Sequence, residues 1–181
     1  MIDTTEAAHQ EVHSMLLRMR EVAVQAANDT LTSADRTALN SEVSALEKEI
    51  TAIAKNTTFG GVSLGVSNVK VFQIGAAKGA TLTHTFANFN VSTIGADVAV
   101  DTLTNAQNAL ETIDGAISTI STKRGTLGAL SNRLSSTIAN LDNIAVNLSS
   151  ARGRIQDTDF AQETSNLAKS QIMQQAATAM L

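Results

Sequence analysis

The stretch that decides the fold is LTNAQNALETIDGAISTISTKRGTLGALSNRLSSTIANLDNIAVNLSSARGRI, residues 103–155. Apolar residues recur along it in steps that alternate between three and four, which is typical of one narrow stripe along a helix. Such a stripe needs a partner helix in a coiled-coil-like contact, and we expect the rest of the chain to supply it. Thirteen of its sixteen positions are apolar, the exceptions being Arg124, Ser131 and Arg152. The sixteen positions are Leu103, Ala106, Leu110, Ile113, Ile117, Ile120, Arg124, Leu127, Ser131, Leu134, Ile138, Leu141, Ala145, Leu148, Arg152 and Ile155.

No proline interrupts this stretch or any other part of the chain. A helix of about fifty residues is about 75 Å long, which is longer than a compact domain of this size is wide, so the sequence predicts a rod. Gly115, Gly125 and Gly128 each weaken a helix by about 1 kcal/mol relative to alanine. A bend or break is therefore predicted at 123–128, where Arg124 and Ser131 on the stripe also indicate looser packing.

The composition limits both the core and the class of function. The chain has 181 residues, a net charge of −4, five phenylalanines and no Trp, Tyr or Cys. A core of Leu, Ile, Val and Ala suits contacts between helices and suits a ligand pocket poorly, and no cofactor is predicted. The absence of cysteine excludes disulfides, and the absence of a basic stripe argues against nucleic acid as a partner. The sequence predicts neither a membrane span nor a standard secretory signal.

Two amphipathic helices precede the long one. Residues 2–28 place one apolar face on a helix, formed by Val12, Met15, Leu16, Met19, Val22, Ala23 and Ala26. Thr32 to Asp35 resembles a capping box that opens a second helix, which ends near Asn56. Its apolar positions again alternate between four and three, at Leu39, Val43, Leu46, Ile50 and Ile53.

Between these helices and the long one the pattern changes to period two. Phe59-Gly60-Gly61 is a turn, and 69–74 and 81–86 read as the strands of a small β-hairpin region at one end of the rod. After the long helix, Asp157-Thr158-Asp159 can cap a further helix whose apolar residues have no evident partner within the chain, so that a missing segment or another subunit is expected to cover them. These apolar residues form the predicted terminal assembly stripe: Phe160, Leu167, Ile172, Ala176 and Met180.

The predicted fold class is mainly α, an elongated antiparallel helical rod of two N-terminal helices and one long C-terminal helix with a small β-hairpin region at one end. The predicted parts are 1–57 for the N-terminal rod helices, 58–100 for the β-hairpin and short variable region, 101–156 for the long helix, and 157–181 for the start of a terminal-domain helix. No nucleophile, base and orienting group can be placed together, so the chain is not predicted to be an enzyme.

Five motifs in this chain resemble bacterial flagellin, in the family's order. The closing NLSSARGRIQDTDFA at 147–161 and SQIMQQA at 170–176 are similar to the family's C-terminal signature, and LLRMREVAVQAAN at 16–28 to its N-terminal one. TFGGV at 58–62 resembles the family's T-x-F-N-G-x, and FQIGA at 72–76 its motif before the variable region. The resemblance implies the same rod fold and a structural function, self-assembly with other flagellin subunits into the extracellular flagellar filament for motility.

The resemblance also implies how such a chain reaches the outside of the cell. Flagellins leave through the flagellum's own export channel without a cleaved signal peptide, and an export chaperone at the C-terminal region is a possible partner. The family's helix before the rod has no counterpart ahead of Met1, and the last helix stops at Leu181. A shortened chain that folds yet polymerises poorly is expected from that comparison.

Residues near the N-terminal motif have two interpretations. The resemblance implies that they form part of the surface read by the innate immune Toll-like receptor for flagellin, with Arg18 as the leading contact and Glu42 as a second. The alternative is that the same face packs against neighbouring subunits, and both can hold. The predicted receptor or subunit interface is Leu16, Arg18, Met19, Arg20, Glu21, Val24, Gln25 and Glu42.

Other polar clusters favour ordinary interpretations. His9 and His13 have a spacing that can chelate zinc, but Gln10 stands where a zinc protease has glutamate and no third ligand can be named, which favours a solvated helix face. Lys123-Arg124 indicates solvated or intersubunit charge.

The alternative to a filament subunit is a flagellin-like binding module at the cell surface, for carbohydrate or a host receptor, or a filament-junction protein. The absence of Trp and Tyr argues against stacking on a sugar.

Overall fold

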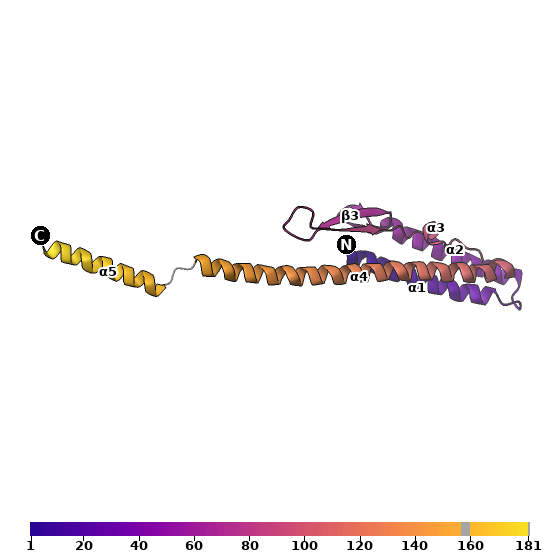
Figure 1. Ribbon diagram of the computed structural model, residues 1–181. Coiled ribbons are helices and arrows are strands. Elements are labelled where there is room, and N and C mark those ends of the chain that lie inside the picture. Colours follow the sequence, from indigo (N-terminus) through magenta and orange to yellow (C-terminus); the bar gives the residue numbers. More distant parts are fainter. Residues whose placement is uncertain (157–159, 181) are drawn as a thin grey trace. The chain divides into compact units, whose positions relative to one another are not determined.

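The computed structural model describes residues 1–156 and 160–180 and divides the chain into two compact units, Met1–Ser136 and Thr137–Leu181 (Figure 1). The predicted mainly α class is confirmed. The helices are α1 (Ile2–Ala26), α2 (Ser33–Asn56), α3 (Val91–Ile94), α4 (Leu103–Gln156) and α5 (Phe160–Ala179). The strands are β1 (Thr58–Phe59), β2 (Val62–Ser63), β3 (Asn68–Gln73) and β4 (Thr81–Phe86).

A capping box opens α2, as the sequence predicts. The Thr32 hydroxyl accepts a hydrogen bond from the Asp35 backbone N–H at 3.3 Å, and the Asp35 carboxylate accepts one from the Thr32 N–H at 3.0 Å. Two otherwise unpaired backbone donors are thereby satisfied, which fixes the first turn of α2 directly after the turn that follows α1.

Two ion pairs show how α4 runs relative to α1 within the first unit. Arg124 of α4 pairs with Glu6 near the start of α1, and Asp114 pairs with Arg20 farther along α1, so α4 runs antiparallel to α1. The short 27–32 connection returns α2 along α1 in the opposite direction, and Figure 1 shows α1, α2 and the first part of α4 side by side.

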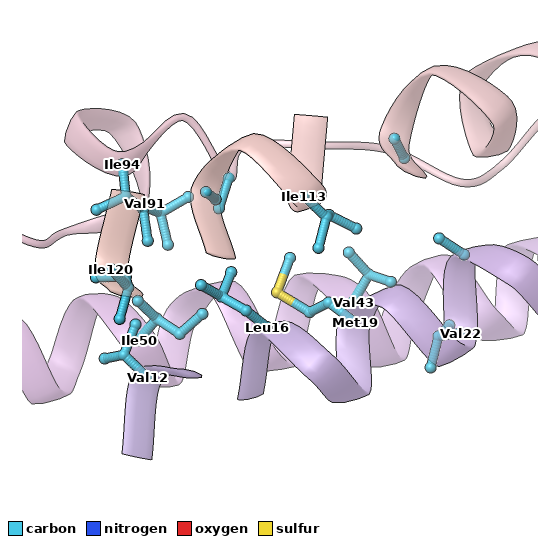
Figure 2. Packing of buried hydrophobic residues seen from close by; sticks show 14 of the residues in the cluster. Val12, Leu16, Met19, Val22, Val43, Ile50, Val91, Ile94, Ile113 and Ile120 are labelled. Carbon is cyan, nitrogen blue, oxygen red and sulfur yellow. The ribbon is translucent and has the colours of Figure 1, made fainter. Parts of the chain in front are cut away.

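The buried face of α4 is shifted from the predicted stripe. Ala106, Ile113, Ile120 and Leu127 are buried as expected, but the stripe's other positions are half-buried from Leu103 to Leu134, while Ala109, Ala116 and Leu130 lie in the interior. The reason is that α4 packs in a cluster with residues of α1, α2 and the segment from Phe89 to Val100, so its contact surface is wider than a two-helix seam (Figure 2).

Of the predicted bend or break at 123–128, the break is wrong, because α4 is one continuous helix from Leu103 to Gln156, and the bend stays a prediction. Buried side chains at Ile120, Leu127 and Leu130 anchor this stretch to the core, and their contacts offset the weaker helix propensity of glycine.

The second half of the stripe is also not covered by the chain's own helices. From Ile138 to Ile155 the apolar positions are exposed, and the expectation that this chain supplies a partner for the whole stripe fails there.

The segment between α2 and α4 contains the predicted hairpin, β3 paired with β4, and a smaller one that the sequence indicated only as a turn. β1 and β2 pair across Gly60 and Gly61, whose φ values of 57° and 79° favour glycine. In β4, Leu82 and Phe86 are buried. The segment before α4 is held by α2, because Glu47 accepts the Val98 N–H at 2.8 Å, and Asn40 accepts that of Val100 at the same distance.

Candidate interaction surfaces

Arg18 forms a charge network on the side of α1 that faces α2. Its Nη2 lies 2.7 Å from Glu42 Oε1, and its Nη1 lies 3.1 Å from Glu21 Oε2. The hydrogen bonds to Glu42 and then to Glu21 raise the pKa of Arg18 above its usual value. All three side chains remain well exposed, so the network is accessible to a partner while it links α1 to α2.

Arg20 lies on the other side of the same exposed face. Its guanidinium donates to both carboxylate oxygens of Asp114 in α4, at 2.7 and 3.4 Å, and this contact raises the pKa of Arg20. Residues two apart on a helix point in directions about 200° apart, which is why Arg18 reaches α2 and Arg20 reaches α4. The exposed face of α1 is therefore bordered by two interhelical ion pairs.

Between these borders lie apolar and polar side chains open to solvent. Leu17 is 44% exposed and Val24 is 51% exposed, and Glu21 and Gln25 are exposed as well. Leu17 was missing from the predicted interface, although its spacing of seven from Val24 places both on one side of the helix. We call the exposed Leu17, Arg18, Arg20, Glu21, Val24 and Gln25 of α1, together with the half-buried Glu42 of α2, the α1 face.

Two residues of the predicted interface do not belong to it. Leu16 and Met19 have no solvent exposure and lie in the core cluster with Val12, Val43 and Ile113 (Figure 2). Their place follows from the helix period, since they continue the apolar face at 12, 16, 19 and 23 that packs inward. The prediction that they contact a receptor or a neighbouring subunit is therefore corrected.

The second unit carries a different surface, on α5. The predicted assembly residues Phe160, Leu167, Ile172, Ala176 and Met180 are all exposed. They do not form one stripe, because the five-residue step from Leu167 to Ile172 turns the helix by about 140°. Phe160 and Leu167 share one side of α5, and Ile172, Ala176 and Met180 another. The predicted cap Asp157-Thr158-Asp159 lies outside the described residues.

The end of α4 adds to the exposed apolar surface of this unit. Ile138 is 59% exposed, and the side chains farther along the helix are comparably open. The six side chains are Ile138, Leu141, Ile144, Val146, Leu148 and Ile155. Ile138, Leu141, Leu148 and Ile155 were positions of the predicted stripe, whereas Ile144 and Val146 were not, and none of the six was among the predicted assembly residues.

The histidine pair of α1 and the Lys123-Arg124 pair of α4 differ in their surroundings from the solvated or intersubunit positions that the sequence predicts. His9 is buried rather than solvated, whereas His13, one turn on, is half-exposed. Lys123 and Arg124 make contacts within the chain, to the Asn88 carbonyl and to Glu6. Among residues 1–156 and 160–180, no three His, Cys, Asp or Glu side chains gather as metal ligands, and no helix there is long and apolar enough to cross a membrane.

Comparison with known proteins finds flagellins along the whole chain. Residues 1–64 match the family model of the bacterial flagellin N-terminal helical region, and residues 110–181 match that of the C-terminal helical region. A flagellin of Halalkalibacterium halodurans is 40% identical over 186 aligned positions, which cover all of this chain and 68% of that protein. The B-type flagellin of Pseudomonas aeruginosa is 50% identical over 86 residues, 48% of this chain and 18% of that protein.

A solved structure gives the same result for the fold. The crystal structure of Bacillus cereus flagellin superposes with a TM-score of 0.71 at 30% identity, covering 83% of this chain and 89% of that one.

Proposed function

The chain belongs to the bacterial flagellin family, and from this premise we propose that it builds the extracellular flagellar filament through the exposed apolar side chains of α4 and α5. It is a structural protein whose partners are other flagellin subunits. The observation that carries the proposal is the similarity to a flagellin over the full length of this chain. The alternative of a carbohydrate-binding or receptor-binding module at the cell surface is not favoured.

The second unit supplies the surface for assembly. Its described side chains include none that is buried, although Ile138, Ile155, Leu167 and Ile172 are large and apolar. Clustered apolar side chains of this size mark sites of protein contact, because leaving them in water costs about 25 cal/mol per Å² of apolar surface. Neighbouring subunits in a filament would cover the faces that this chain leaves open.

The test replaces apolar side chains on both sides of α5. We introduce the double substitution Leu167→Asp with Ile172→Asp into the gene for this chain in its own bacterium. We expect it to abolish filaments, because burying an unpaired carboxylate costs on the order of 5 kcal/mol. The matched control is Asn166→Asp with Ser170→Asp, which adds the same charge between the two apolar sides of the same helix. Filaments are counted by electron microscopy of negatively stained cells.

A second readout separates assembly from export. The apolar-to-Asp variant should appear in the growth medium as monomer in amounts comparable to the control. Normal filaments from that variant would refute the proposed role of α5, and absence of the variant from the medium would place the defect before assembly.

We further propose that α5 is covered before assembly by an export chaperone, and that the chain leaves the cell by the flagellar export route. The exposed Ile172, Met173 and Leu167 support a transient partner, because apolar side chains left open at cellular concentrations promote aggregation.

A second binding function is proposed for the α1 face. Arg18 combines exposure with a fixed orientation set by Glu21 and Glu42, and arginines held in this way are frequent anchors of protein interfaces. We propose that the host Toll-like receptor for flagellin recognises this face on the monomer, and that neighbouring subunits cover the same face in the filament.

The receptor proposal predicts that Arg18→Ala lowers the activation of receptor-expressing reporter cells by at least about tenfold, the effect of losing about 1.4 kcal/mol of binding. Lys48→Ala, at an exposed position of α2 outside the α1 face, is the matched control. Equal activation by both variants and by the unchanged chain would exclude Arg18 as a contact.

A further inference from the structure

His9 is a polar side chain in the interior of the first unit. Its side chain is 2% exposed, and its ring packs edge-on against Phe89 with the centroids 4.7 Å apart. Neither ring nitrogen has a hydrogen-bond partner within the part of the chain that the structure describes. A neutral imidazole therefore keeps one donor and one acceptor unmet, which is unfavourable for a buried polar group.

The ring borders a small cavity where three parts of the first unit meet. The cavity measures about 20 Å³. It is lined by Thr5 and His9 of α1, by the end of β4 and its continuation from His84 to Ala87, and by α4 from Lys123 to Leu127. His9 is thus placed at the junction that joins the first turns of α1 and the hairpin to the middle of α4.

Charged and titratable side chains from α1, β4 and α4 surround His9. Lys123 and Arg124 of α4 are cationic, and Lys123 is committed to the Asn88 carbonyl. Glu6 of α1 is the one carboxylate that acts on His9, and one of its oxygens is already paired with Arg124 at 2.7 Å. The other Glu6 oxygen is buried and unpaired, and His84 of β4 is the remaining titratable group at the cavity.

We propose that His9 is a pH switch. When its ring gains a proton, the start of α1 and the 84–89 segment separate from α4. A proton added to His9 would create a third cation beside Lys123 and Arg124 in a site with little solvent. Only Glu6 opposes that repulsion, and its attraction is already shared with Arg124. Local opening relieves the strain because it returns the ring to water.

The direction of the pH effect follows from the difference between the folded and the unfolded chain. Burial, and then the charge of Lys123, lower the pKa of His9 from 6.5 to about 4, while Glu6 opposes this change. Above pH 6.5 the ring is neutral in both states, and the start of α1 and the 84–89 segment stay packed against α4. Between pH 6.5 and about 4 the opened chain binds a proton that the closed one does not, so the closed state loses stability as the pH falls.

The first measurement is the titration of the three histidines by NMR of the full chain, with the signals assigned by single substitutions. The pKa of His9 should be about 4, below the 6.5 of an ordinary imidazole. Lys123→Met, which removes one of the two facing cations, should move the His9 midpoint upward by at least half a unit, an effect that a purely structural change would not produce. A His9 midpoint near 6.5, or one that Lys123→Met leaves unchanged, would overturn the proposal.

The second measurement is hydrogen exchange followed by mass spectrometry at several pH values, corrected for the intrinsic rate. On going from pH 7 to 4.5, segments 2–12, 84–89 and 120–130 should lose protection about fiftyfold, the factor that follows from the two pKa values. His9→Leu should keep its protection over this range, whereas the control His13→Leu should lose it as the unchanged chain does. His9→Gln, which stays neutral and polar, must give the same acid resistance if leucine does not pack.

Equal acid sensitivity of the His9 variants and the unchanged chain would show that this histidine does not operate the junction. None of these readouts depends on filament formation or receptor activation.

Discussion

At the scale of single residues, Arg36 shows how one side chain fixes a helix end. It is 9% exposed and lies at the start of α2, where its Nε donates to the Ala26 carbonyl at 3.0 Å and its Nη2 donates to the Asn28 carbonyl at 2.9 Å. These carbonyls belong to the end of α1 and the turn after it, where helical partners run out. The positive charge also lies at the negative end of the α1 dipole.

Arg36→Met should therefore destabilise the first unit by about 2 kcal/mol, because it keeps the bulk of the side chain but leaves the two carbonyls without their charged donor. The measurement is urea unfolding followed by far-UV circular dichroism at pH 7. Arg20→Met is the control, since its ion pair with Asp114 is exposed and screened by solvent and should contribute little to stability. If the two variants unfold at the same urea concentration, the cap contributes nothing beyond a surface ion pair.

The α1 face has some residues that helical periodicity identifies and some contacts that depend on residues far away in the sequence. Helical periodicity alone excludes Leu16 and Met19 from the α1 face, because both fall on the same apolar side as Val12. Periodicity does not show that Arg18 turns to Glu42 and Arg20 to Asp114, since those partners are 24 and 94 residues away. The residues of the surface could thus be predicted in part from the sequence, whereas the two ion pairs at its borders could not.

At the scale of elements, local sequence signals succeeded where the interaction is local. The Thr32–Asp35 capping box spans four residues. The strand predicted at 69–74 from its β-rich residues is β3 at 68–73, and the strand predicted at 81–86 from its alternation is β4. The number of helices that contact α4 is not a local property. The stripe predicted for a two-helix contact therefore did not include Ala109 and Ala116, which are buried.

Gly65 is an element-scale contact that the sequence did not reveal. A Cβ built on it would lie 1.6 Å from the Ala54 backbone oxygen, so the chain after β2 passes directly against the end of α2. Only a residue without a side chain permits that approach. The sequence shows a glycine after Leu64 but contains no information about the backbone 11 residues earlier that requires it.

At the scale of the whole molecule, the two units differ in what holds their helices. In the first unit, side chains of α1, α2, α4 and the 89–100 segment share one core, and burial along α4 continues to Leu127 and Leu130. In the second unit, the described side chains have no buried member, and α5 consists of 20 residues. Most of the stability of a helix in a protein comes from packing one of its faces against other elements, and the described side chains of α5 are all exposed.

We therefore predict a sharp step in amide protection within α4 of the unassembled chain. Hydrogen exchange at neutral pH should show opening free energies near the global value up to about Leu130. Values lower by at least about 3 kcal/mol, a hundredfold faster exchange, should follow beyond Ile138 and through 160–180. In filaments the same amides should become protected, because neighbouring subunits then cover the exposed apolar side chains.

The position of the step distinguishes burial from helix propensity as its cause. Gly125 and Gly128 lie inside the stretch anchored by Ile120, Leu127 and Leu130, and a Cβ at either glycine would meet no other group. If weak propensity set the boundary, protection would fall at Gly125, and Gly125→Ala with Gly128→Ala would move the step toward the C-terminus. If the core sets it, the double substitution should leave the step between Leu130 and Ile138, because no buried side chain is gained beyond that point.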